Sequence, residues 1–86
     1  MTVIVYTKTG CPWTPPVTAF LKENQIPFEE RDIFKNPEYR KEVEEKSGQN
    51  KSPTLDIGGV IVADADVEQV AEAIAKVRSS ERPGTP

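Results

Sequence analysis

One short segment carries the residues that could do chemistry: Thr9-Gly10-Cys11-Pro12-Trp13-Thr14. Cys11 is the only cysteine among the 86 residues, and the chain has no histidine. An internal disulfide, a Cys-His catalytic pair and a zinc site of cysteine and histidine within one chain are therefore excluded. A nucleophilic cysteine acts as the thiolate, which attacks disulfides. With a single thiol, any disulfide exchange at this segment is monothiol chemistry.

Cys11 has two interpretations. A lone cysteine is commonly a small buried hydrophobic residue. Cys11, however, lies between Gly10 and Pro12 in a predicted turn, where a side chain is exposed. Backbone amides at the start of a following helix also favour a thiolate. We therefore interpret Cys11 as the candidate nucleophile.

Two elements must position this turn. Residues 2–7 include the apolar run Val3-Ile4-Val5-Tyr6, which predicts a central buried strand. Thr14-Pro15-Pro16 predicts a helix with Thr14 as its N-cap and the prolines at its first two positions, where a missing N–H loses no hydrogen bond. A helix start this far along the chain would set Cys11 back from the helix end and leave its thiol less acidic.

The remaining elements follow from turns and caps. Residues 26–33 predict an edge strand, Asn36-Pro37 begins a polar helix that ends at Ser47-Gly48, and Gly58-Gly59 joins two strands at 53–57 and 60–62. Asp66 caps a final helix, with Gln69 as its capping-box partner. The order is βαβαββα, which predicts an α/β fold with a four-stranded mixed sheet flanked by three helices. We expect one domain over residues 1–77 and a disordered tail over 78–86.

The composition and charge of the chain argue against two classes of binding partner. A net charge of -3 argues against binding to a nucleic-acid backbone. No apolar run approaches the ~20 residues that span a bilayer, and the N-terminus shows no signal-peptide pattern. We therefore expect a cytoplasmic protein without a membrane or nucleic-acid partner.

The chain resembles the glutaredoxins over about residues 2–77. Motifs at matching intervals are Tyr6-Thr7-Lys8, the Cys11 turn, Arg31-Asp32-Ile33, Pro37-Glu38, Ser47-Gly48, Ser52-Pro53-Thr54 and Ile57-Gly58-Gly59. The family's usual Cys-Pro-Tyr-Cys reads Cys-Pro-Trp-Thr here, so Thr14 stands in place of the second cysteine. The resemblance implies a thioredoxin-like fold and a monothiol thiol-disulfide oxidoreductase. It would act through Cys11 on glutathione mixed disulfides, as a monomer, with glutathione as co-substrate and no metal.

The resemblance also implies roles for residues around Cys11. Lys8 would stabilise the thiolate and bind the glycine carboxylate of glutathione, although a lysine at a strand end is more often simply solvated. The bond between Ser52 and Pro53 would be cis, with Pro53 packed against Cys11 and the backbone of Ser52 pairing with the glutathione peptide. The family's Thr-Val-Pro reads Lys-Ser-Pro here, which replaces an apolar contact with a hydroxyl.

Three further positions have two interpretations each. Asp66 would hold the γ-glutamyl ammonium of glutathione in addition to capping its helix. Ala63-Asp64-Ala65 replaces the family's flexible glycines before this helix. Asp64 should contribute less to glutathione binding than Asp66. Trp13 is either a lid over the peptide groove or a surface aromatic. Thr14 is either only the helix cap, which is the safer interpretation, or a hydroxyl that hydrogen-bonds the thiolate.

Two alternative functions remain open at this stage. One is a thioredoxin-fold module that binds a protein without turnover, which the missing second cysteine and the altered turn before the last helix would fit. The other is an iron–sulfur cluster carrier like the family's Cys-Gly-Phe-Ser branch, from which Pro12-Trp13 departs. A depressed thiol pKa distinguishes a catalyst from a binding module, because only a catalyst needs it.

Overall fold

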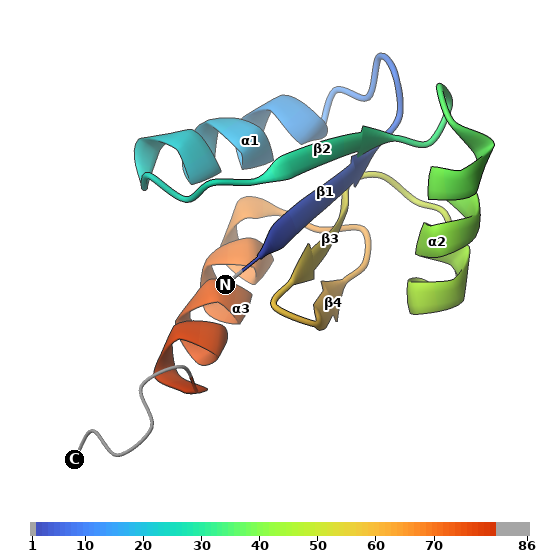
Figure 1. Cartoon of the computed structure of the whole chain (residues 1–86). Helices are drawn as coiled ribbons and strands as arrows, with labels where there is room; N and C mark the ends of the chain where they lie inside the picture. The colour runs from blue at the N-terminus through green and yellow to red at the C-terminus, as the bar shows by residue number, and fades with distance from the viewer. Residues whose placement is uncertain (1, 81–86) are drawn as a thin grey trace.

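The computed structural model describes residues 2–80, and over that range the chain has the predicted order βαβαββα. The elements are β1 (Val3–Thr7), α1 (Thr14–Glu23), β2 (Glu29–Asp32), α2 (Pro37–Ser47), β3 (Thr54–Ile57), β4 (Val60–Val62) and α3 (Val67–Ser80). Figure 1 shows α1 and α3 together on one side of the strands and α2 on the other. The predicted fold class is confirmed.

The strands form one mixed sheet in the order β2-β1-β3-β4. β1 pairs in parallel with β2 and antiparallel with β3, and β4 completes a hairpin with β3. β1 is therefore a central strand and β2 an edge strand, as the sequence predicted. The carboxyl end of β1, where the Cys11 turn begins, lies beside the carboxyl end of its parallel neighbour β2.

The face of the sheet toward α1 and α3 carries the main hydrophobic core. Val5 and Leu55 from adjacent strands pack with Leu21 of α1 and Val70 of α3, all of them fully buried. Burying each such aliphatic side chain contributes roughly 1.5–3 kcal/mol. This layer fixes the position of α1, and hence of the turn that precedes it.

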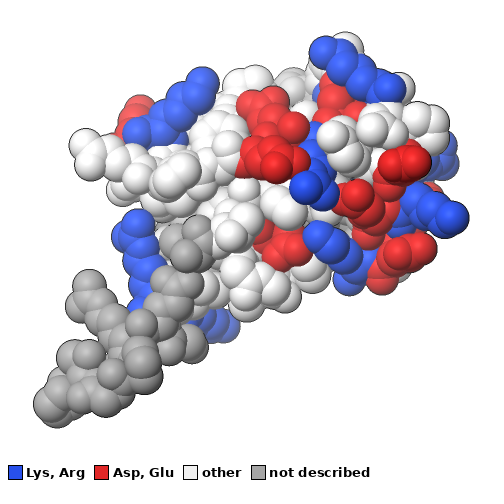
Figure 2. Space-filling view, in the orientation of Figure 1, with Lys and Arg blue, Asp and Glu red and all other residues white. Residues whose placement is uncertain are grey.

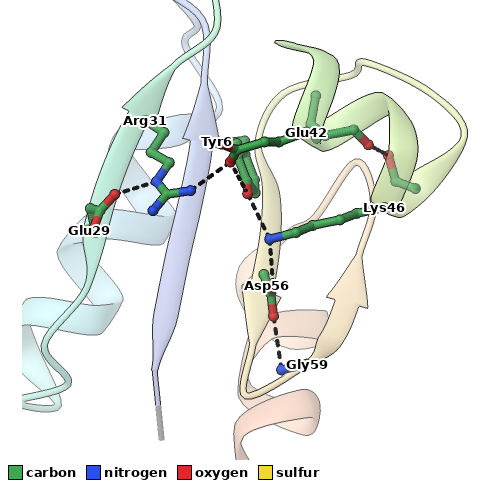
Figure 3. A network of polar contacts seen from close by, with 9 residues as sticks. Tyr6, Glu29, Arg31, Glu42, Lys46, Asp56 and Gly59 are labelled. Atoms are coloured by element: carbon green, nitrogen blue, oxygen red, sulfur yellow. Dashed lines mark hydrogen bonds and ion pairs between the residues drawn. The ribbon is translucent and has the colours of Figure 1, made fainter. Parts of the chain in front are cut away.

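The opposite face, under α2, combines a small apolar cluster of Tyr6, Ile33 and Val43 with a network of polar contacts (Figure 3). Lys46 of α2 donates to Tyr6 Oη and to Asp56 Oδ2, both at 2.8 Å. Tyr6 donates in turn to Glu42 Oε1 at 2.9 Å, and Arg31 of β2 donates to the same oxygen at 2.6 Å. Hydrogen bonds from Tyr6 and Arg31 outweigh the effect of burial and hold the pKa of Glu42 below its ordinary value. α2 is thus tied to three strands by side chains that carry charge.

Local signals at the other helix ends behave as predicted. The Asn36 side chain accepts from the Glu38 N–H at 3.0 Å, and Gly48 ends α2 in a left-handed conformation. Asp66 and Gln69 form a reciprocal capping box before α3, with bonds of 3.1 and 2.8 Å.

Three boundaries differ clearly from prediction. β2 begins at Glu29, three residues after the predicted start at residue 26. Thr14 is the first residue of α1 and Trp13 takes the cap position, so the prediction of a Thr14 cap was wrong. Pro15 and Pro16 lack N–H groups, which removes much of the need for a cap and frees the Thr14 hydroxyl for tertiary contacts. α3 runs to Ser80, past the expected domain end at residue 77, and residues 81–86 of the expected tail lie outside the described residues.

The surface has no strongly basic face in the view of Figure 2, where acidic and basic side chains are interspersed, most densely over α2. Among residues 2–80, no helix is both long and apolar enough to cross a membrane.

Candidate active site

The turn after β1 places Cys11 at the edge of the sheet. The Cys11 N–H donates to the Lys8 carbonyl at 3.0 Å, which closes a four-residue turn. Gly10, the third residue of that turn, has φ +82°, a conformation that glycine adopts without steric cost. The half-buried Cys11 side chain therefore lies between the end of β1 and the first turn of α1.

The loop before β3 comes up against this turn. The Ser52-Pro53 bond is cis, as expected from the resemblance, and Pro53 is fully buried. Cys11 Sγ donates to the Ser52 carbonyl at 3.7 Å, and the Ser52 hydroxyl accepts from the Lys8 N–H at 3.2 Å. The Pro53 carbonyl accepts from the Ala65 N–H at 2.8 Å, which ties this loop to the turn before α3.

Three hydroxyl groups gather beneath Cys11. Thr14 Oγ1 lies 2.8 Å from Thr7 Oγ1 and 3.4 Å from Ser52 Oγ. Thr7 and Thr14 are each only 7% exposed. The Thr14 hydroxyl thus has tertiary partners close to the thiol, as the second interpretation expects, and lacks the cap contact that the first interpretation requires.

These groups make the Cys11 thiol more acidic. Burial by itself raises the pKa of Cys11, but hydrogen bonds from the Ser52 and Thr14 hydroxyls and from the backbone N–H groups of Trp13 and Thr14 outweigh it, so the pKa lies below its ordinary value. These donors come from the start of α1 and from the Ser52 loop. The expectation that the late helix start leaves the thiol less acidic than it would be nearer the helix end stays a prediction.

Lys8 has a different neighbour from the one expected. Its ammonium lies 5.9 Å from the ring centroid of Phe34, in the loop that follows β2. The groups that lower the pKa of Cys11 are hydrogen-bond donors, and Lys8 is not among them. The role of Lys8 toward the thiolate stays a prediction.

Two hollows meet at Trp13. The first, of about 350 Å³, surrounds Cys11 and is lined also by Lys8, Lys51, Ser52 and Asp64. The second, of about 670 Å³, runs between the starts of α1 and α3. Its lining residues are Trp13, Pro16, Val17, Asp64, Ala65, Asp66, Val67 and Glu68. Trp13 is 69% exposed and lines both hollows, and its role as a lid over a peptide groove stays a prediction.

The structure brings most of the predicted site residues together but separates one of them. Lys8, Cys11, Trp13 and Ser52 line the hollow around the sulfur, whereas Asp66 lines only the second hollow. The Asp66 carboxylate accepts the Gln69 N–H, as its cap role requires. Asp64, expected to matter less, lines both hollows.

Sequence reasoning missed two residues at the mouth of the site. Phe34 is 65% exposed and lines the first hollow, and Lys51 lies on the opposite loop. Both follow or precede a strand at the edge of the sheet where Cys11 lies, and loops at the carboxyl ends of parallel strands commonly carry ligand sites. An aromatic residue two positions before the Asn36 cap was the signal that could have indicated Phe34.

Comparison with known proteins agrees with this geometry. A family model described as glutaredoxin matches residues 3–62. The solution structure of glutaredoxin from Brucella melitensis is 35% identical and has a TM-score of 0.67, with 100% of this chain and 94% of that chain covered. Glutaredoxin from Archaeoglobus fulgidus is 27% identical, with a TM-score of 0.73 and 84% of each chain covered.

The thioredoxin-like protein BC3987 is 31% identical, with a TM-score of 0.76, and the match covers 81% of this chain and 96% of that one. No protein among the curated sequences matches at a significant level. The matched family model spans most of the chain, including the Cys11 turn, the cis Ser52-Pro53 loop and the four strands that hold them. This chain belongs to the glutaredoxin family and is a glutaredoxin-like thiol oxidoreductase with the thioredoxin-like fold.

Proposed function

We propose that the chain reduces glutathione mixed disulfides by a monothiol mechanism with Cys11 as the nucleophile. The observation that carries the proposal is the position of Cys11 Sγ, half-buried at the mouth of a hollow and beside hydroxyl and amide donors that lower its pKa. A lower pKa raises the fraction of thiolate near neutral pH, and the thiolate is the species that attacks a disulfide.

The charges around the hollow support glutathione as the co-substrate. Lys8 and Lys51 line one part of it, and Asp64 lines it on the border with the groove toward Asp66. Glutathione carries carboxylates at both ends and one ammonium on its γ-glutamyl residue. The lysines would pair with the glycine carboxylate, and Asp64 with Asp66 would attract the ammonium.

The reaction needs two disulfide exchanges. The Cys11 thiolate attacks the glutathione sulfur of a mixed disulfide, a Cys11–glutathione disulfide forms, and the substrate leaves as a thiolate that takes up a proton. A second glutathione, as its thiolate, then attacks the glutathione sulfur held by Cys11. Oxidised glutathione leaves and the Cys11 thiolate returns. Thr14 occupies the place of a resolving thiol, and its hydroxyl forms no disulfide, so the second glutathione is required.

Cys11→Ser tests the proposal directly. Release of glutathione from a glutathionylated peptide, coupled to reduced glutathione, should be catalysed by the wild-type chain and lost in the variant. Mass spectrometry after exposure to oxidised glutathione should show one glutathione adduct on the wild-type chain and none on Cys11→Ser. Activity retained by the variant would show that Cys11 is not the nucleophile.

One observation supports the alternative of a binding module. The exposed indole of Trp13 borders the larger groove, and an exposed aromatic beside a groove is typical of a surface that binds protein. A module without turnover would form the glutathione adduct slowly and would not be regenerated by reduced glutathione. The two assays on the wild-type chain therefore separate the alternatives.

A further inference from the structure

Each of the two hydroxyls that lower the pKa of Cys11 has a hydrogen-bond partner at the carboxyl end of β1 or directly after it. Thr7 Oγ1 lies 2.8 Å from Thr14 Oγ1, and the N–H of the next residue, Lys8, donates to Ser52 Oγ at 3.2 Å. The Thr14 and Ser52 hydroxyls are the two side-chain donors that lower the pKa of Cys11. Thr7, the last residue of β1, and Lys8, which follows it, thus hold the two side-chain donors of the site, and Thr7 does so from a buried position.

The direction of the bond between the two threonines follows from their other partners. Apart from Thr14, the acceptor within reach of the Thr7 hydroxyl is the Lys8 carbonyl, at a long 3.5 Å. Thr14 Oγ1 is the better acceptor for the Thr7 proton. Once Thr14 Oγ1 accepts that hydrogen bond, its own O–H points away from Thr7, toward Ser52 Oγ at 3.4 Å.

Ionisation of Cys11 favours this arrangement. A thiolate is a stronger hydrogen-bond acceptor than the Ser52 hydroxyl oxygen, so the Thr14 proton turns to the sulfur when it is charged. A hydroxyl that accepts a hydrogen bond becomes a stronger donor, because bonds in a chain polarise one another. Thr7 would therefore act on the sulfur through Thr14.

We propose that Thr7 is a positioning residue for the nucleophile, whose hydroxyl donates to Thr14 Oγ1 and thereby directs the Thr14 hydroxyl to Cys11 Sγ. The inference rests on the proposed function only in taking Cys11 as the nucleophile. It assigns a role in thiol chemistry to a residue that has no contact with the substrate hollow, since Thr7 lines only a smaller pocket behind Cys11.

Charged groups also surround the thiol and must stay constant in any test. Lys8, Lys51 and Asp64 line the hollow in front of Cys11, and Glu30 and Asp32 line the pocket behind it. None of these five residues is changed in the variants below. Differences in the Cys11 pKa between variants therefore report the hydroxyl groups.

The test compares Thr7→Val, which keeps the shape and removes the hydroxyl, with Thr7→Ser, which keeps the hydroxyl. The Cys11 pKa is measured from the ultraviolet absorbance of the thiolate against pH, with Cys11→Ser as the blank. The Thr7 hydroxyl adds only a fraction of the strength of the bond between Thr14 and the thiolate. We therefore expect Thr7→Val to raise the pKa of Cys11 by about half a unit. Thr7→Ser should restore the wild-type value.

A matched control comes from α1. Thr18 is also buried, but its hydroxyl donates to the backbone carbonyls of Pro15 at 3.1 Å and Thr14 at 3.4 Å, and not toward the sulfur. Thr18→Val should leave the Cys11 pKa unchanged even where it lowers stability. In a Thr14→Val background, Thr7→Val should add no further shift, because Thr7 acts through Thr14.

The proposal is overturned if folded Thr7→Val keeps the wild-type pKa, or if it shifts the pKa equally with and without Thr14. If Thr7→Val does not fold, the wild-type chain still decides: the Thr7 methyl resonance should titrate with the Cys11 pKa and stop doing so in Cys11→Ser. A flat Thr7 methyl resonance through that titration would equally overturn the proposal. These readouts need no substrate, so they stand whether or not the chain releases glutathione.

Discussion

Ser52→Ala should raise the pKa of Cys11, because it removes one donor from the thiolate and little else. The Ser52 hydroxyl is held by the Lys8 N–H at 3.2 Å and lowers the pKa of Cys11. The Ser52 carbonyl, which Cys11 Sγ contacts at 3.7 Å, belongs to the backbone and remains in the variant. The substitution thus separates the side chain of Ser52 from its backbone role.

The magnitude follows from the type of bond and the exposure of the sulfur. A hydrogen bond to a charged group contributes roughly 1.5–3 kcal/mol, and about 1.36 kcal/mol corresponds to one pKa unit. Cys11 is only half-buried, so water replaces part of what the hydroxyl supplied. We therefore expect a rise of about 0.5–1 unit and, below the pKa, a thiolate fraction about three to ten times smaller.

Alkylation of Cys11 by iodoacetamide across pH gives the pKa, and the rate of glutathione release gives its consequence. Ser47→Ala is the matched control, because it also removes a half-buried serine hydroxyl, one that donates to backbone carbonyls at the end of α2. The control should leave the alkylation profile in place. A Ser52→Ala profile that is unchanged, or shifted to lower pH, would refute the reasoning.

Other perturbations test the scaffold and the substrate hollow. Lys46→Met removes the ion pair between Lys46 and Asp56, in which the lysine side chain is 33% exposed. Because water screens part of the attraction, we expect urea unfolding to show a loss of about 1 kcal/mol in the free energy of unfolding, and no loss would mean that the pair does not stabilise the fold. Because the folded-state pKa of Cys11 is lowered, its contribution to stability is present above the unfolded thiol pKa of ~8.5 and is lost as pH falls through the folded value. The excess stability of wild type over Cys11→Ser should therefore grow as pH rises toward about 9 in denaturant titrations, and a constant difference would contradict the lowered pKa. Asp64→Asn should raise the KM for glutathione more than Asp66→Asn, since only Asp64 lines the Cys11 hollow, and steady-state kinetics with the reverse order would assign the ammonium to Asp66.

Much of the fold could be predicted because its signals act over short stretches of chain. A run of apolar residues identified β1 as central, and Asn36 and Asp66 marked helix starts through bonds to amides two or three residues ahead. The failure at Thr14 has the same origin. The Thr14 hydroxyl contacts Thr7, outside the local segment, and a capping rule based on neighbouring residues does not include such tertiary contacts.

The sequence by itself determined the candidate nucleophile, its turn and the family. Cys11 is the only thiol, Gly10 supplies the conformation that the turn requires, and the motifs that identify the glutaredoxins lie at readable intervals. Only the tertiary structure decided what surrounds the sulfur. Ser52 is 41 residues from Cys11 in the chain and comes beside it only because β3 pairs with β1 and the loop before β3 lies at the same edge of the sheet. Which side chains meet there depends on strand register and on packing across the sheet, and neither is encoded in the spacing of residues around Cys11.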